Sequence, residues 1–262
     1  MLRAAFVDAG WHAIFVNCYN DDLPKIAQGC DHICVVGGDG SLRDAIEKLA
    51  NIPNSPPLSM YPAGTINLVA REAGYPTNVK DFVARITGLG KNRHHYHGLA
   101  NGKPLVVCAS VGPDSAAVAN VSQQLKRRIG RFAYVAAFGK LLWQWPRSNI
   151  QVEADGKTMK GEAAFILNGR YFAGQFTLNP KADLTVPNFQ ILVLPTARRR
   201  DYFRLALSAV IHPIFASKAW HEMPASSVTV RGDIALPVQI DGDIAATLPL
   251  SAAIGKNAWA YR

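Results

Sequence analysis

The stretch that decides the fold is Ile33-Cys34-Val35-Val36-Gly37-Gly38-Asp39-Gly40-Ser41-Leu42. Its first four residues are apolar and predict a short buried strand, which runs directly into a glycine-rich loop. Apolar residues then recur at helical spacing, at Leu42, Ala45, Ile46 and Leu49. Strand, glycine loop and helix in this order are typical of a parallel sheet that is covered by helices.

The same order of elements follows again in the first third of the chain. Residues 58–61 predict a strand, Pro62-Ala63-Gly64-Thr65 a second glycine-bearing loop, and residues 66–73 a helix that ends at Gly74. Upstream, residues 2–9 predict a helix and residues 13–16 a short buried strand. We therefore expect an α/β N-terminal domain over residues 1–93, with a parallel sheet, covering helices and no counterpart of the usual opening strand.

Strand patterns dominate the sequence from about residue 94 onward. They cover residues 105–110, 150–154, 163–167, 190–194, 228–231 and 238–241. Asp155-Gly156 lies between two of these segments and is a hairpin turn signal. Helical patterns occupy about residues 122–143 and 198–211. We expect a β-rich, sandwich-like second domain over residues 94–262 with helical insertions, and we interpret His94-His95-Tyr96-His97 as a connector.

The composition is that of a folded chain with a substantial core. Of 262 residues, 49% are hydrophobic and 18% are charged, which excludes a disordered protein. No apolar run approaches the roughly 18 residues of a membrane span, and no basic-then-apolar leader opens the chain. The four cysteines form no Cys-x-x-Cys pair, so free thiols are expected. These features predict a cytoplasmic protein.

The net charge of +9 favours anionic partners. Part of the charge is clustered in residues 126–131 and 198–200, which are either basic contact surfaces or solvated helix faces. The segment 141–147 mixes aromatic residues with a basic end, and this pattern predicts peripheral contact with an anionic membrane surface. In the alternative interpretation, its tryptophans Trp143 and Trp145 pack in the core of the second domain. Charge alone, without aromatic-basic strand motifs, does not indicate nucleic acid, and a homodimer stays open.

The two glycine loops indicate a phosphate site. Glycines at the carboxyl edge of a parallel sheet let backbone N–H groups approach phosphate oxygens, and the following helix directs its positive end at them. Asp39 inside such a loop calls for a cation between carboxylate and phosphate, and Mg²⁺ is the simplest choice. Thr65 and Asn67 add hydroxyl and amide groups from the second loop. A tight turn with a helix cap is the alternative for the first loop. Neither loop is followed by the Gly-Lys-Ser/Thr of a P-loop.

Five blocks of the sequence, in order, resemble the diacylglycerol kinase catalytic-domain family, which includes bacterial diacylglycerol and related lipid kinases and sphingosine kinases. Residues 35–42 resemble its Gly-Gly-Asp-Gly-Thr signature, and residues 62–71 its Pro-x-Gly-Thr-x-Asn block. Residues 110–114, 168–174 and 240–243 resemble three later blocks of the family. The resemblance spans nearly the whole chain.

The resemblance implies an ATP- and Mg²⁺-dependent lipid kinase that phosphorylates a hydroxyl of a lipid such as diacylglycerol or a sphingoid base. It implies that the ATP phosphates are bound by Gly37, Gly38, Gly40, Ser41, Gly64, Thr65 and Asn67. Asp39 would act with Mg²⁺ and in catalysis, and Asp114 would join the metal-linked acidic network. Asp241 would be the general base that takes the proton from the lipid hydroxyl as it attacks the γ-phosphate.

The sequence departs from the family pattern at several positions. Ser41 replaces threonine, Leu68 stands where many members have aspartate, and Asp243 replaces glutamate. The family's opening strand, which carries a phosphate motif, has no counterpart before Leu2. These departures leave two alternatives open: a catalytically silent nucleotide- or lipid-binding member of the family, and an NAD kinase, which shares the Gly-Gly-Asp-Gly block.

Overall fold

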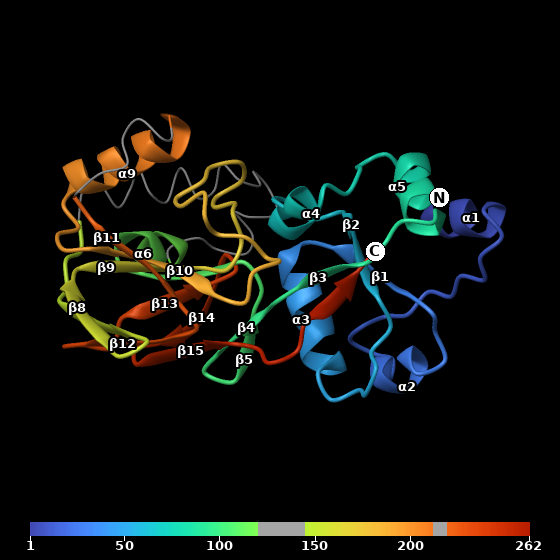
Figure 1. The fold of residues 1–262 in the computed structure, drawn as a ribbon, viewed down its shortest axis with the longest axis horizontal. Helices are drawn as coiled ribbons and strands as arrows, with labels where there is room; N and C mark the ends of the chain where they lie inside the picture. The colour runs from blue at the N-terminus through green and yellow to red at the C-terminus, as the bar shows by residue number, and fades with distance from the viewer. Residues whose placement is uncertain (120–144, 212–218) are drawn as a thin grey trace.

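The computed structural model describes residues 1–119, 145–211 and 219–262. Figure 1 shows an elongated molecule with a helix-rich half, which holds both chain ends, and a strand-rich half. The described helices are α1 Leu2–Asp8, α2 Leu23–Ala27, α3 Asp39–Leu49, α4 Leu68–Ala73, α5 Val79–Thr87, α6 Pro113–Ala119 and α9 Arg199–Ile211. The described strands are β1 Ile33–Gly37, β2 Leu58–Pro62, β3 Arg93–His95, β4 Gly98–Ala100, β5 Lys103–Leu105, β6 Cys108–Val111, β7 Ile150–Ala154, β8 Lys157–Gly161, β9 Ala163–Leu167, β10 Phe189–Leu194, β11 His221–Ala225, β12 Ser227–Gly232, β13 Pro237–Ile240, β14 Asp243–Thr247, β15 Leu250–Ile254 and β16 Trp259–Tyr261.

The helix-rich half is built on a sheet with the strand order β1-β2-β16-β3. β1 and β2 are parallel, and their register sets Gly37 opposite Pro62, so both glycine loops leave the same edge. β16, from the end of the chain, runs parallel to β2 and antiparallel to β3. The expected parallel sheet with covering helices is confirmed, with one antiparallel strand added at its edge.

The helices form where their apolar spacing predicts them. α3 buries its apolar face, made of Leu42, Ala45, Ile46 and Leu49. α4 ends at Gly74, whose φ of +74° is left-handed, a conformation that glycine adopts without steric cost. The opening helix is also confirmed as α1.

The short strand expected at residues 13–16 is wrong. Residues 11–17 pair with no described strand, and Ile14 and Phe15 are 52% and 67% exposed. An apolar run becomes a stable strand only when a neighbouring strand satisfies its backbone N–H and C=O groups. β1 lies at the edge of its sheet, but residues 11–17 form no ladder with it in the described structure, so this segment stays irregular at the surface.

The strand-rich half is a sandwich of two six-stranded sheets. Their orders are β11-β10-β9-β6-β13-β14 and β5-β4-β15-β12-β7-β8. Alternate residues of both sheets point inward and form one core, which includes Ile166 and Ile191 from the first sheet and Val152 and Val230 from the second. The sandwich-like prediction is confirmed, and so is the hairpin turn, where Asp155 and Gly156 join β7 to β8 with φ of 43° and 80°.

The strand expected over residues 105–110 is interrupted. It divides into β5 and β6, which lie in different sheets. Between them, the backbone N–H groups of Val106, Val107 and Cys108 all donate to the carboxylate of Asp241. The side chain of a distant residue therefore takes the place of a strand partner and lets the chain cross from one sheet to the other.

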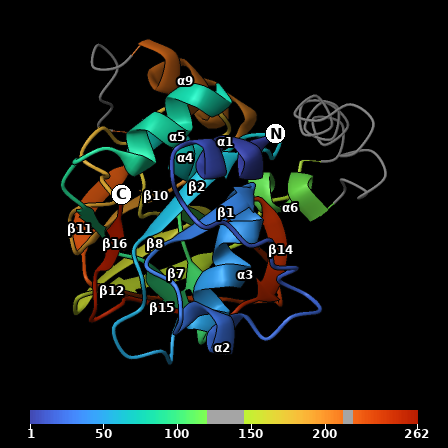
Figure 2. The same cartoon turned by 90° about the vertical axis from the view of Figure 1, so that its right-hand side faces the viewer.

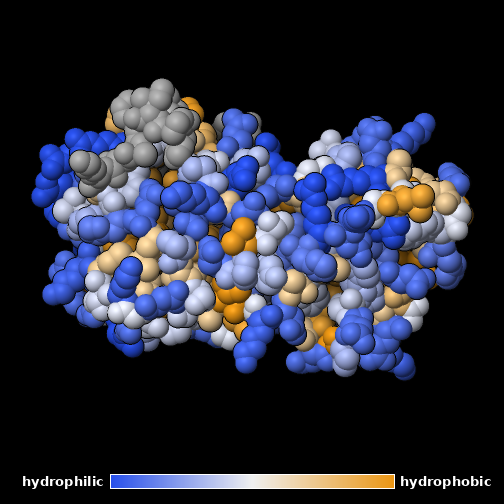
Figure 3. Space-filling view, in the orientation of Figure 1, coloured by the Kyte–Doolittle hydropathy of each residue, from blue (hydrophilic) through white to orange (hydrophobic). Residues whose placement is uncertain are grey.

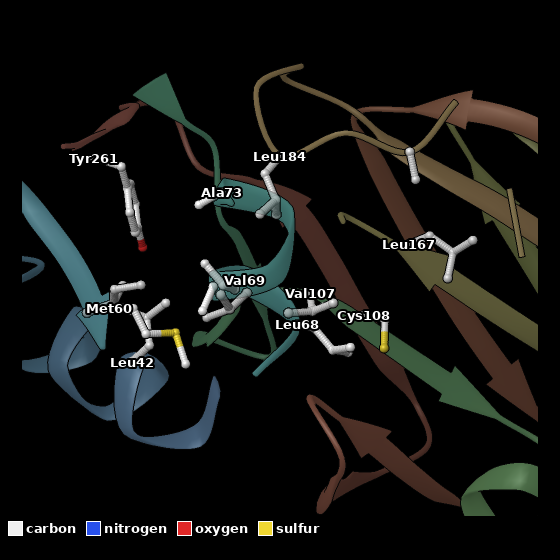
Figure 4. Packing of buried hydrophobic residues seen from close by; sticks show 14 of the residues in the cluster. Leu42, Met60, Leu68, Val69, Ala73, Val107, Cys108, Leu167, Leu184 and Tyr261 are labelled. Atoms are coloured by element: carbon white, nitrogen blue, oxygen red, sulfur yellow. The ribbon is translucent and has the colours of Figure 1, made fainter. Parts of the chain in front are cut away.

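One hydrophobic cluster crosses the junction between the two halves. Figure 4 shows α4 between them, with Leu42, Met60 and Tyr261 on one side of it and Val107 and Leu184 on the other. The boundary at residues 93 and 94 stays a prediction. We propose a first domain of residues 1–93. Its sheet is completed by β3, at the boundary, and by β16, from the end of the chain.

Three further sequence predictions have separate outcomes. Within the described ranges, no helix is long and apolar enough to cross a membrane. All four cysteines are free, and Cys108 is buried. The helix at 122–143, the basic cluster at 126–131 and Trp143 lie outside the described residues, while Trp145 packs edge-on against Tyr202 with ring centroids 5.3 Å apart.

Candidate active site

The two glycine loops meet at the carboxyl edge of the parallel strands. The backbone N–H of Ala63 donates to the carbonyl of Gly37 at 3.1 Å. A Cβ atom on Gly64 would lie 2.5 Å from the Cα of Gly38, closer than any real Cβ contact. Only glycine at residue 64 allows this approach of one backbone to the other. Residues 37–41 and 64–67, which the sequence assigned to one edge, are therefore in direct contact.

The second loop is held in shape by Asn67. Its side-chain Oδ1 accepts the N–H of Gly64 at 3.0 Å, and its Nδ2 donates to the carbonyl of Gly64 at 2.8 Å. The φ of Asn67 is +56°, a left-handed conformation that asparagine tolerates better than most residues. Thr65 lies at the exposed tip. Asn67 therefore builds the loop, and Thr65 is the side chain that the loop presents to solvent.

Asp39 joins the first loop to the helix that follows the second. It is the first residue of α3, and its carboxylate accepts the N–H groups of Leu68 and Val69 at 2.8 and 3.0 Å. Burial raises the pKa of Asp39 above its ordinary value, while these two N–H groups act in the opposite direction. Asp39 thus caps α4, a helix to which it does not belong.

Asp241 lies at the junction of β5 and β6. Its carboxylate accepts N–H groups from Val106, Val107 and Cys108 at 3.0, 2.7 and 3.1 Å. Burial raises the pKa of Asp241 to about 6, and the three N–H groups limit that rise. The structure therefore gives Asp241 a half-buried carboxylate whose two oxygens accept three backbone N–H groups. Its assignment as general base stays a prediction.

Asp114 lies in the first turn of α6 and is half-buried. It contacts the Ser110 hydroxyl and accepts the Tyr202 hydroxyl at 3.0 Å. Burial raises its pKa above the ordinary value. Ser110 Oγ also lies 2.9 Å from Oε1 of Gln239; a hydroxyl has one proton to donate, so donation to Gln239 requires a proton on Asp114. The metal role of Asp114 stays a prediction.

Asp243 and Arg43 form the contact that the sequence interpretation missed. Arg43 Nη2 lies 3.4 Å from Asp243 Oδ2, and Arg43 Nη1 donates to the carbonyl of Ile240 at 3.1 Å. Asp243 Oδ2 is also 3.9 Å from the point that a Cβ on Gly40 would occupy. The Asp243 side chain is 42% exposed. A carboxylate of the sandwich thus faces the first glycine loop across the junction.

Comparison with known proteins identifies the family. Residues 19–96 match the family described as the diacylglycerol kinase catalytic domain. Residues 107–259, more than half of the chain, match the YegS C-terminal NAD kinase beta sandwich-like domain. The chain belongs to the diacylglycerol kinase family. Each half of this family member therefore matches a described domain, and the family is one of lipid kinases.

Relatives of this diacylglycerol kinase family member cover most of the chain. It is 26% identical over 235 residues to a diacylglycerol kinase of Staphylococcus saprophyticus, with 86% of this chain and 74% of the relative covered. It is 27% identical over 221 residues to a diacylglycerol kinase of Bacillus subtilis, with 84% and 73% covered. A crystal structure of a diacylglycerol kinase from Bacillus anthracis aligns over 100% of this chain and 90% of its own chain, with a TM-score of 0.75 and 17% sequence identity. A second structure from that strain has a TM-score of 0.81 at 18% identity, with 100% of this chain and 89% of that chain covered. These two structures support the fold.

The donor set of this family member suits a magnesium ion that is bound mainly by its substrate. Within the described part of the chain, no group of three His, Cys, Asp or Glu side chains could hold a metal by itself. Mg²⁺ keeps several waters and commonly uses one or two carboxylates together with substrate phosphates. Asp243 faces Gly40, and Asp39 lies in the first turn of α3, where its carboxylate also accepts the N–H groups of Leu68 and Val69. These two carboxylates fit that pattern better than Asp114.

Proposed function

We propose that this protein transfers the γ-phosphate of ATP, with Mg²⁺, to a hydroxyl group of a lipid such as diacylglycerol or a sphingoid base. The observation that carries the proposal is the backbone contact between Gly38 and Gly64, with Asp243 facing the same loop. Phosphoryl transfer needs phosphate binding, charge neutralisation and a carboxylate near the attacking oxygen, and these loops and the acids beside them would serve those needs.

The phosphates would lie over the first turn of α3 and the tip of the second loop. α3 has 11 residues, and its N-terminus directs backbone N–H groups and a partial positive charge away from the sheet edge. Gly37, Gly38, Gly40 and Ser41 would bind from the first loop, and Gly64, Thr65 and Asn67 from the second. Arg43 adds a fixed positive charge one helical turn after the loop begins.

Magnesium would neutralise the charge of the phosphates when bound. Asp39 and Asp243 would hold it together with the phosphate oxygens, since both belong to or face the glycine loops. Asp39 would also keep α4 against the first loop, so that the two loops stay in one geometry while the nucleotide binds.

Two carboxylates compete for the role of general base. Asp241 is half-buried with a pKa of about 6, a value suited to proton transfer near neutral pH. Asp243 is 42% exposed, faces Gly40 and is oriented by Arg43. A base must come within hydrogen-bond distance of the lipid hydroxyl. The exposure of Asp243 favours it for this contact; in that role Asp243 would leave the magnesium to Asp39 and the phosphate oxygens, with Asp241 holding the β5–β6 junction.

The lipid would be reached by adsorption at an anionic membrane surface. α9 carries exposed Phe203 and Val210, at 71% and 65% exposed, which are seven residues apart and share a helix face. Arg200 in the first turn is also exposed. Apolar residues flanked by arginines are typical of helices that lie in the membrane interface. These residues support the peripheral contact predicted from the charge of +9.

The proposal is tested by incubating the protein with labelled ATP, Mg²⁺ and separate acceptors: diacylglycerol, a sphingoid base, ceramide and NAD. Label in an organic-extractable product supports lipid phosphorylation, and the acceptor that gives it names the substrate. Label on NAD supports an NAD kinase instead. No transfer to any acceptor, in a protein that still binds ATP, supports a catalytically silent member of the family.

A further inference from the structure

Two adjoining hollows lie at the end of α4 away from the glycine loops. The N-terminal residues of α4 bond to Asp39, whereas its C-terminal residues Glu72 and Ala73 line the hollows. Their volumes are about 400 and 170 Å³, and Arg93 and His95 of β3 line both. Figure 2 shows β16, the neighbour of β3, on the side of the molecule opposite to α6 and β14. This place is therefore separate from the candidate active site.

Residues of both halves form the larger hollow. Glu72, Arg93 and His95 come from the helix-rich half, and Arg170, Tyr171 and residues 183–185 come from the sandwich. Glu72 accepts the backbone N–H groups of Arg170 at 2.7 Å and Leu184 at 2.9 Å, which fixes the sandwich loops against α4. The Glu72 carboxylate thus holds the backbone of the sandwich loops in place at this wall.

Together the two hollows are lined by five basic side chains and two acids, so their net charge is positive. Both acids are engaged, Glu72 with the two N–H groups above and Asp183 with Thr185 and Arg170. Lys91 and Arg93 are exposed, and in the described part of the chain no side-chain hydrogen bond or ion pair is formed by either. In the space-filling view, hydrophilic residues predominate over this junction near α4 (Figure 3).

His95 supplies a polar group that the protein leaves without a partner. The residue is 2% exposed, and its ring stacks on Tyr261 with centroids 4.3 Å apart. Its Nδ1 is buried and hydrogen-bonds to none of the described residues. A buried polar atom without a partner is destabilising, and a ligand atom that bonds to it removes that penalty. Burial and the nearby Arg93 lower the pKa of His95 to about 4, so at neutral pH the ring is an uncharged donor and acceptor.

We propose that these hollows form a second ligand site that binds a phosphomonoester between the two halves of the molecule. Arg93 and Arg170 flank the larger hollow from opposite sides, and the guanidinium fork matches the oxygens of a phosphate group. A volume of about 400 Å³ suits a small polar molecule that carries one phosphate. The phosphate belongs either to a soluble ester or to the headgroup of a phosphorylated lipid.

Binding is measured by titration calorimetry with glycerol 3-phosphate as the soluble probe, and by co-sedimentation with phosphatidylcholine vesicles that do or do not contain phosphatidic acid. Arg93→Gln and Arg170→Gln are each expected to weaken binding of the preferred probe about tenfold. His95→Phe, which keeps the stacked ring and removes the nitrogens, weakens it as well. Arg231→Gln is the matched control, because Arg231 is an exposed arginine on β12, 59% exposed, that contacts Glu153.

Asp183→Asn separates charge from folding. The variant keeps an Oδ1 acceptor for Thr185 and removes one negative charge from the hollow, so it is expected to bind the phosphate more tightly than the native protein. Glycerol 3-phosphate binding identifies a soluble ester, and phosphatidic acid-dependent sedimentation lost in both arginine variants identifies a lipid headgroup. Failure of both probes to bind, or binding that both arginine variants leave unchanged, overturns the proposal.

This site does not rest on the kinase proposal. Gly64→Ala, which disturbs the glycine loops, is expected to weaken ATP binding and leave binding of the phosphomonoester unchanged. Loss of phosphomonoester binding in Gly64→Ala would place that ligand in the glycine loops and overturn the second site. Absence of label transfer to lipid, with binding still sensitive to Arg93, would refute the kinase and leave the second site intact.

Discussion

The carboxylate of Asp39 accepts the backbone N–H of Leu68, 29 residues later in the chain, at 2.8 Å. The same carboxylate also accepts the N–H of Val69. The first residue of α3 therefore caps α4, and α4 packs between the two halves of the molecule (Figure 4). A residue that the sequence assigned to magnesium also determines how the two glycine loops are held together.

Asp39→Asn is expected to lower both stability and activity. The amide keeps one acceptor and turns an NH₂ group toward a backbone N–H, which leaves buried donors facing each other. The free energy of unfolding should fall by about 1–3 kcal/mol, and label transfer should fall by about a hundredfold or more. Urea unfolding and the kinase assay measure the two effects. Glu47→Gln, an exposed acid on the same helix, should change neither; equal effects in both variants would contradict the capping role.

Gly64→Ala is expected to separate the two loops. Its Cβ would lie 2.5 Å from the Cα of Gly38 and 2.7 Å from Oδ1 of Asn67, so the backbone must move. We expect the KM for ATP to rise about tenfold or more, because phosphate-binding geometry tolerates little displacement. Gly90→Ala is the control, since a Cβ there would meet nothing within 4 Å. An unchanged KM in Gly64→Ala would show that the loop contact is not needed for nucleotide binding.

Local patterns predicted most of the elements correctly. The spacing of Leu42, Ala45, Ile46 and Leu49 predicted the buried face of α3, and Asp155-Gly156 predicted the hairpin between β7 and β8. These features depend only on a few neighbouring residues, so a single sequence is enough to predict them. The strand at residues 13–16 failed for the opposite reason. Whether an apolar run pairs depends on which strand lies beside it, and no local pattern states that.

The contacts between the halves could not be predicted. The helical spacing sets Arg43 off the apolar face of α3, yet it reaches Ile240 and Asp243, about 200 residues later. Asp241 was assigned a chemical role, although its three N–H donors divide β5 from β6. In both cases the residue type and local spacing are compatible with several partners. The chain's three-dimensional path selects one.

Asp243→Asn is expected to lower kcat by about a hundredfold or more, because Asp243 faces Gly40 and the phosphates that would lie there. Arg43→Ala should lower kcat about tenfold by releasing Asp243, with Arg43→Lys between the two because lysine keeps the charge without the fork. Arg3→Ala, an exposed arginine of α1, is the control. Native kcat in Asp243→Asn, together with loss in Asp241→Asn, would return the role of base to Asp241.

Asp241 should make the protein less stable as the pH rises toward neutrality. Its pKa is about 6 in the folded protein against 3.8 for an ordinary aspartate, so the folded state binds the proton more tightly than the unfolded state. The stability that this group contributes is complete below about pH 4 and is lost as the pH rises through about 6, a change of about 3 kcal/mol. Asp241→Asn cannot ionise and should lack this part of the pH dependence.

Urea unfolding of both proteins at about pH 4.5 and about pH 8 measures the difference. Asp114, whose pKa is also raised, leaves a residual dependence in the variant. Equal changes with pH in the two proteins would mean that the Asp241 carboxylate stays ionised in the folded state and is stabilised by the N–H groups of Val106, Val107 and Cys108.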